Sequence, residues 1–231
     1  YQWKRAGTAI SGATSTTYTL TQSDVGSAIT VTASYTDGQN TAESSTSSAT
    51  SSVANVNDAG TGLSLASDGD VADPDEDDAL SVTGTLADED GVTNAAPTYV
   101  WKRAGTAISS ATSSSYTLVQ ADVGTIISVV ISYTDDQSES NTITLTAASD
   151  VDNVNDSPTG SVTISGTATE DQVLTAANTL ADEDVLGSIS YQWKRAGTAI
   201  SGATSTTYTL TQSDVGSAIT VTASYTDGQN T

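Results

Sequence analysis

The side chains of this sequence that could do chemistry are almost all carboxylates. There are 28 Asp and Glu residues against 6 Lys and Arg, for a formal net charge of −22, and there is no His, Cys or Met. This inventory lacks the commonest general base, the thiol nucleophile and the soft metal ligands. Oxygen ligands alone fit calcium, which takes about six to eight of them from carboxylates, amide side chains and backbone carbonyls. The same charge disfavours binding to nucleic acid or anionic lipid.

The acidic residues recur at corresponding places, beside two copies of the sequence Asn-Val-Asn-Asp. These copies end at Asp58 and Asp156, and each is followed by small or turn-forming residues that are typical of linkers. The sequence Leu-Ala-Asp-Glu-Asp is identical at 86–90 and 180–184. This repetition favours calcium ligation over a merely solvated acidic surface, which remains the alternative. A separate acidic run at 68–78 could form a further loop site or stay hydrated.

These carboxylates are carried by a repeated sequence. Residues 1–41 recur without change at 191–231, and a variant third copy begins at Tyr99. The linkers divide the chain into the C-terminal part of one module, a complete module and the N-terminal part of another, at 1–58, 59–156 and 157–231. Because partial modules would expose their cores, we expect the natural chain to continue in both directions, or neighbouring chains to complete them.

Short alternating apolar runs between turn signals predict β-strands throughout the modules. In the complete module, Leu80 alternates with Val82, and Ile127 with Val129, in the manner of strands with one buried face. No stretch has a sustained helical period. The sequence therefore predicts an all-β chain of stacked sandwiches. No segment approaches the roughly 20 apolar residues needed to span a bilayer, so we expect no membrane insertion of these residues.

Three tryptophans, Trp3, Trp101 and Trp193, occupy the same place in the three copies. We predict that they are buried in the cores and do not stack on sugars. All six basic residues directly follow these tryptophans as Lys-Arg pairs, and we expect them to form solvated ion pairs of little energetic weight. Each copy also has an Asp-Val-Gly turn, whose aspartate either caps the turn or ligates a metal.

A family resemblance follows from these elements together. The Trp strand, the following Gly-Thr-Ala-Ile-Ser hairpin, the Tyr-Thr-Leu strand and the Asp-Val-Gly turn resemble the tandem immunoglobulin-like modules of large bacterial surface adhesins. The resemblance implies tandem immunoglobulin-like β-sandwich repeats in an elongated array, located outside a bacterial cell or on its surface. Ala28 and Thr30 stand where antibody domains carry a Tyr and a Cys, so the tyrosine corner and the disulfide are absent.

The immunoglobulin-like topology implies that acidic loops of neighbouring modules meet beside each linker. This is similar to cadherin repeats, whose linkers bind calcium and stiffen the joint. The candidate ligands at the first linker are Asp24, Asn57, Asp58, Asp88, Asp90, Asp135 and Asp136. Those at the second linker are Glu76, Asp77, Asp122, Asn155, Asp156, Asp182, Asp184 and Asp227. Calcium and neighbouring repeats, of the same or an adjoining chain, are the expected partners, and a homopolymeric filament is a possible assembly.

We therefore expect a non-enzymatic extracellular structural repeat, either the extender region of an adhesin or part of a cell-surface fibre. An array of carbohydrate-binding modules is the alternative. It would need exposed aromatic rings, and the only candidates outside the predicted core are Tyr18, Tyr116 and Tyr208. A glycosidase is disfavoured, because a catalytic carboxylate pair would not be expected in triplicate within a structural repeat.

Overall fold

The computed structural model describes residues 1–228 and shows an almost entirely β-sheet protein. Strands make up 42% of the chain and helix 4%, which confirms the all-β prediction. The ladders of four of its five sheets are antiparallel. The chain divides into two compact units: 1–66 with 80–116 and 127–146, and 67–79 with 117–126 and residues from 147 onward.

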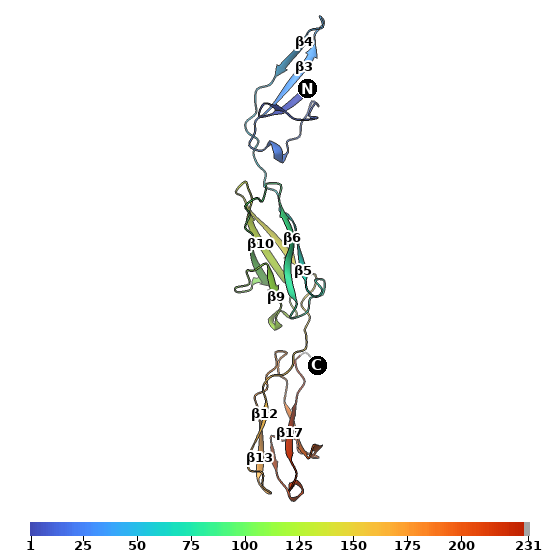
Figure 1. The fold of residues 1–231 in the computed structure, drawn as a ribbon, viewed down its shortest axis with the longest axis vertical. Coiled ribbons are helices and arrows are strands. Elements are labelled where there is room, and N and C mark those ends of the chain that lie inside the picture. The colour runs from blue at the N-terminus through green and yellow to red at the C-terminus, as the bar shows by residue number, and fades with distance from the viewer. Residues whose placement is uncertain (229–231) are drawn as a thin grey trace. The chain divides into compact units, whose positions relative to one another are not determined.

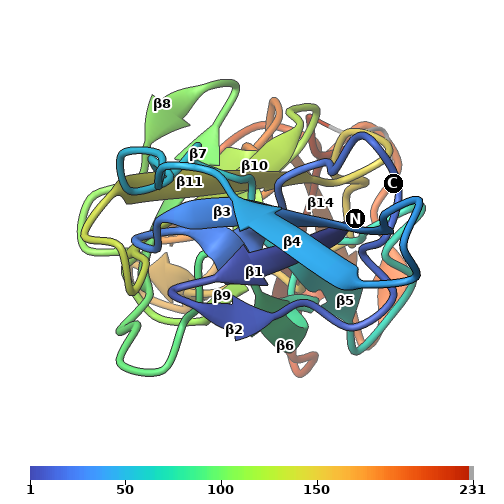
Figure 2. The same ribbon diagram turned by 90° about the horizontal axis from the view of Figure 1, so that it is seen from above.

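The first unit begins with a four-stranded sheet in the order β2-β1-β3-β4. Its strands are β1 (Gln2–Arg5), β2 (Thr8–Ala9), β3 (Ile29–Thr36) and β4 (Ala42–Thr46). In this sheet Trp3 is paired with Val31. Figure 2 shows β1, β3 and β4 side by side. A short 3-10 helix, η1 (Gln22–Asp24), precedes β3 and contains the aspartate of the Asp-Val-Gly turn.

Two further sheets of the first unit have the orders β5-β6-β9 and β11-β10-β7-β8. Their strands are β5 (Thr61–Ser67), β6 (Ala79–Ala87), β7 (Thr98–Arg103), β8 (Thr106–Ala107), β9 (Ser115–Thr117), β10 (Ile127–Thr134) and β11 (Ser140–Thr146). Figure 1 labels β5, β6, β9 and β10 of this set.

The predicted core of this part of the chain is confirmed. Trp101 is fully buried, and along β10 the side chains of Ile127, Val129, Ile131 and Tyr133 are buried while those between them are not. The ring of Trp101 on β7 lies 5.7 Å from that of Tyr116 on β9, so the two sheets meet at this pair. The indole nitrogen of Trp101 donates to the carbonyl oxygen of Ser113 at 2.9 Å, which satisfies its one polar atom.

The second unit contains two three-stranded sheets, in the orders β12-β13-β16 and β15-β14-β17. Their strands are β12 (Val162–Ser165), β13 (Val173–Asn178), β14 (Ser190–Arg195), β15 (Thr198–Ala199), β16 (Thr207–Thr209) and β17 (Ile219–Ser224). Leu174, Ala176, Trp193 and Leu210 form their buried core, which confirms the burial of Trp193. The 3-10 helices η2 (Gln120–Asp122) and η3 (Gln212–Asp214) lie in this unit. Within residues 1–228, no helix is long and apolar enough to cross a membrane.

Candidate metal centre

The aspartate of the Asp-Val-Gly turn belongs to a buried hydrogen-bond network. Asp24 is fully buried, and its Oδ1 lies 2.7 Å from Nε of Arg5. Its Oδ2 accepts hydrogen bonds from the hydroxyl of Tyr18 at 2.9 Å and from the backbone nitrogen of Thr21 at 2.8 Å. Burial raises the pKa of Asp24, but the hydrogen bonds from Thr21, Arg5 and Tyr18 outweigh it and hold the pKa below its ordinary value.

The same network recurs at Asp214, which accepts from Arg195 at 2.6 Å and from Tyr208 at 2.8 Å. Asp122 is also fully buried and accepts from the backbone nitrogen of Val119 at 3.0 Å. All three aspartates thus cap their turns, so the carboxylates of Asp24 and Asp122 are used as hydrogen-bond acceptors within the protein. The prediction of solvated ion pairs is wrong for Arg5 and Arg195, because each guanidinium is bonded to an aspartate that is at most 6% exposed.

The tyrosines considered for carbohydrate binding lie against the core. The rings of Tyr18, Tyr116 and Tyr208 lie 5.8, 5.7 and 5.7 Å from those of the neighbouring tryptophans. All three are half-buried, and the hydroxyls of Tyr18 and Tyr208 donate to the buried aspartates. These rings therefore contribute to core packing.

The first linker is fastened to the loop after β6 by Asp90. This residue is 3% exposed, and its Oδ2 accepts from the backbone nitrogen of Asp58 at 2.9 Å. Its Oδ1 accepts from Nε2 of Gln22 at 2.8 Å. Asp88 accepts from the backbone nitrogen of Asp90 at 2.9 Å and from the hydroxyl of Tyr133 at 2.5 Å. Burial, followed by this bond to Asp88, raises the pKa of Tyr133 to about 12.

The other first-linker candidates also take part in hydrogen bonds within the protein. Asn57 donates to Asn141 at 2.9 Å, and Asn141 donates to Oδ2 of the buried Asp135 at 2.9 Å. Asp136 accepts from the hydroxyl of Thr93 at 2.7 Å, and the hydrogen bonds from Thr93 hold the pKa of Asp136 below its ordinary value. The structure therefore brings Asn57 and Asp58 of the linker to the acidic loops and uses those carboxylates as acceptors.

At the second linker, three carboxylates lie close together, in an environment unlike that of the first-linker carboxylates. Glu76, from the loop between β5 and β6, Asp156, from the linker, and Glu183, from the loop between β13 and β14, offer oxygens that all lie within 4.8 Å of one another. Among the residues that the structure describes, this is the group of acidic side chains whose oxygens lie close enough together to hold one metal ion. Glu183 is absent from the sequence prediction, although it is the fourth residue of the Leu-Ala-Asp-Glu-Asp sequence and lies between the predicted ligands Asp182 and Asp184.

Like charges crowd this group. Glu76 is only 4% exposed, and burial, followed by the charges of Asp156, Asp77 and Asp184, raises its pKa above the ordinary value. Burial also raises the pKa of Asp156, together with the charges of Asp184, Asp77 and Asp182. The charged groups that shift these two carboxylates are all acidic, so a bound cation would relieve their mutual repulsion.

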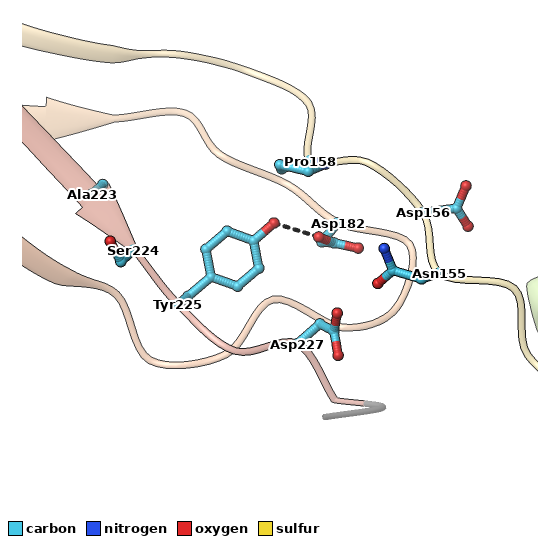
Figure 3. A pocket seen from close by; sticks show the side chains of 8 residues that line it. All are labelled: Asn155, Asp156, Pro158, Asp182, Ala223, Ser224, Tyr225 and Asp227. Carbon is cyan, nitrogen blue, oxygen red and sulfur yellow. Dashed lines mark hydrogen bonds between the residues drawn. The ribbon is translucent and has the colours of Figure 1, made fainter. Parts of the chain in front are cut away.

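Three further candidates of the second linker form a separate group. Figure 3 shows Asn155, Asp182 and Asp227 facing one another beside Tyr225, whereas the carboxylate of Asp156 points away from them. They line an open pocket of about 360 Å³. The hydroxyl of Tyr225 donates to Asp182, and this bond, followed by burial, raises the pKa of Tyr225 to about 12. The eight residues predicted to form one cage therefore do not gather at one place: Asp122 caps a turn, Glu76 and Asp156 belong to the trio, and Asn155, Asp182 and Asp227 line the pocket.

The two linkers have the same local scaffold. At the second, fully buried Asp184 accepts from the backbone nitrogen of Asp156 at 2.8 Å, as Asp90 does from Asp58 at the first. Likewise, Tyr225 bonds Asp182 as Tyr133 bonds Asp88. This scaffold positions Asp156 beside Glu183 and Glu76, because the acceptor Asp184 directly follows Glu183 in the chain.

Comparison with models of protein families and with curated proteins gives no match. A solved structure described as a Ca2+-stabilized adhesin that helps an Antarctic bacterium reach out and bind ice is similar to this chain, with 15% sequence identity and a TM-score of 0.29. The match covers 88% of this chain and 49% of that one, so this chain spans about half of that chain's length. The likeness is distant.

Proposed function

We propose that this chain is a non-enzymatic structural repeat of a bacterial surface adhesin or cell-surface fibre, and that calcium binds at its second linker. The observation that carries the proposal is the trio Glu76, Asp156 and Glu183. Glu76 and the linker residue Asp156 belong to the proposed module 59–156, and Glu183 belongs to the proposed module 157–231. An ion held by all three would tie the loop of one module to the loop of the next.

The donor set suits calcium. Three carboxylates can supply up to six oxygens, and the backbone and water can complete a shell of about six to eight. Neither imidazole nor thiolate is available anywhere in the sequence, which disfavours zinc and copper. Magnesium prefers a small octahedral shell and retains water, so it should bind these spread carboxylates more weakly.

The structural role is supported by what the repeated residues do. The same turn cap, the same tyrosine-to-aspartate bond and the same bond from linker to loop recur along the chain. Repetition of a complete architecture suits a spacer, in which every module has the same task. Calcium at a linker would add stiffness to that spacer.

The proposal is tested by thermal unfolding in millimolar calcium and in sodium chloride of equal ionic strength. Specific binding adds RT ln(1 + [L]/Kd), about 2.7 kcal/mol at 100 times Kd, so the melting temperature should rise in calcium alone. Glu183→Gln should remove most of this rise. Glu89→Gln, at the matching place beside the first linker, is the control and should retain it. Equal melting in both salts, or an equal response of the two variants, would contradict a calcium site at the second linker.

A further inference from the structure

The carboxylate of Glu76 accepts hydrogen bonds from two donors that carry no charge. Of the three carboxylates proposed to hold calcium, Glu76 is the buried one, with 4% of its surface exposed. The side-chain amide nitrogen of Gln120 donates to its Oε2 at 2.9 Å and lies 3.3 Å from its Oε1. The backbone N–H of Val154, in the linker, donates to the same carboxylate. Both donors restrict where the oxygens of Glu76 lie, and neither cancels its negative charge.

Gln120 reaches Glu76 from a fixed position. It is the first residue of η2, whose last residue, Asp122, accepts from the backbone nitrogen of Val119 at 3.0 Å. The other end of the Gln120 amide lies 3.2 Å from the side-chain amide of Asn153 in the linker. One side chain thus bridges the linker and a proposed calcium ligand.

The backbone of Glu76 is fixed by the same linker. Its nitrogen donates to the carbonyl of Asp152 at 2.9 Å, and the nitrogen of Asp152 donates to the carbonyl of Pro74 at 2.9 Å. These two bonds make a parallel bridge between Asp75 and Asp152. The bridge places the backbone of Glu76 but leaves several rotamers open to its side chain. The donors at the carboxylate therefore decide where its oxygens point.

A positively charged donor in the place of Gln120 would oppose a metal ion. The buried Asp214 shows the contrast, because Nε of Arg195 lies 2.6 Å from its Oδ1 and offsets its charge. An amide donor orients a carboxylate and leaves its full charge to attract a cation. Loss of such a partner behind a metal-ligating group typically costs about 10- to 100-fold in metal affinity.

The pairing of this glutamine with a glutamate occurs a second time in the chain. Gln212 is the first residue of η3, and its amide nitrogen donates to Oε2 of Glu170 at 3.2 Å. Glu170 precedes Asp171 as Glu76 precedes Asp77. The approach of the 3-10 helix to this glutamate therefore belongs to the repeated fold.

We propose that Gln120 is a positioning residue of the calcium site, and that it holds the carboxylate of Glu76 toward Asp156 and Glu183. This inference rests on the calcium binding proposed above. The oxygens of the three carboxylates lie within 4.8 Å of one another, and Gln120 binds Glu76 through its amide nitrogen, which is a donor and not a metal ligand. Without that bond Glu76 turns away from the ion, and water takes its coordination place.

Calcium titration by calorimetry compares the intact chain with Gln120→Met, which has an unbranched side chain without an N–H donor. The affinity should fall about 10-fold or more. Gln22→Met is the matched control, because Gln22 has the same place in η1, is half-buried like Gln120 and donates to Asp90 at 2.8 Å. It should leave the affinity unchanged. Gln120→Asn keeps an amide on a shorter side chain, and it should lose affinity as Gln120→Met does.

Terbium(III), used as a luminescent probe of the calcium site, tests whether the loss acts through Glu76. The luminescence lifetimes in H2O and D2O report how many water molecules the bound ion carries. This number should rise in Gln120→Met, because water replaces an oxygen of Glu76, and it should stay unchanged in Gln22→Met. A general loosening of the fold would weaken binding without adding water to the ion.

The outcomes separate this inference from the calcium site itself. Unchanged calcium affinity in Gln120→Met, together with the weaker binding expected of Glu183→Gln, would overturn the positioning role and leave the calcium site standing. Weaker binding in Gln120→Met without added water, or equal weakening in Gln22→Met, would also overturn the positioning role. Absence of calcium binding to the intact chain would overturn the site and the positioning role together.

Discussion

The backbone nitrogen of Asp156 lies 2.8 Å from Oδ2 of Asp184, a carboxylate with no exposed surface. This bond fixes the linker to the following loop. It also carries Asp156 to the place where Glu76 and Glu183 lie within 4.8 Å. The linker therefore has two separable components, a hydrogen bond that forms the joint and a cluster of like charges that a cation would stabilise.

The two components predict opposite effects in the presence of a chelator. Asp184→Ala should lower the free energy of unfolding by about 1–3 kcal/mol, because the donor on Asp156 loses its buried acceptor. Glu183→Ala should cost nothing, or stabilise slightly, because it removes a charge from a repelling cluster. Urea unfolding in chelator measures both. Equal losses in the two variants would mean that Glu183 has a structural role besides that of a ligand.

The ion pair between Arg195 and the buried Asp214 predicts a loss of stability in acid. The hydrogen bonds of Arg195, Thr211 and Tyr208 outweigh burial and hold the pKa of Asp214 far below its ordinary value. The unfolded state therefore binds the proton more readily, so this stability is present at neutral pH and is lost as pH falls from the ordinary aspartate range toward the lowered pKa. In Asp214→Asn, the melting temperature should therefore fall less steeply as the pH is lowered. An unchanged slope would contradict this role.

We predict that strand β4 opens locally more often than strand β11. In the ladder with β3, Ser45 lies opposite Ala33, where Ile143 lies opposite Ile131 in the ladder of β10 and β11. All residues of β4 are exposed, whereas β11 buries Asn141 and half-buries Ile143 and Leu145. Amide hydrogen exchange should therefore be faster in β4. The two segments differ in sequence, so mass spectrometry separates them, and equal protection would contradict the prediction.

Much of the fold could be predicted from the sequence because burial follows a period of two in strands. The alternation of Ile127, Val129 and Ile131 on β10 and the burial of Trp101 are of this kind. The pattern specifies which face of a strand is buried, but it contains no information on where the side chain of a loop residue points. The sequence therefore located the acidic loops, but it did not separate Asp156 from Asp182 or include Glu183.

The ion pairs show a second limit of prediction from the sequence. Arg5 and Asp24 are 19 residues apart, and their contact depends on how β1 packs against the turn before β3. A charged residue after a core tryptophan was expected to be solvated, since most surface ion pairs are. In the fold, the guanidinium of Arg5 instead contacts the carboxylate of Asp24, which is buried in the turn. Hydrogen bonds from Thr21 and Tyr18 also stabilise the charge of that carboxylate.

Calcium titration by calorimetry, with the intact chain and with Glu183→Gln and Glu89→Gln, tests the central claim most directly. The account predicts saturable binding that the first variant weakens at least about 10-fold and the second leaves unchanged, since one charged ligand of a shared ion is removed only in the first. Magnesium should bind less tightly than calcium. If calcium gave no saturable heat, or bound equally to all three proteins, the trio of Glu76, Asp156 and Glu183 would not be a calcium site.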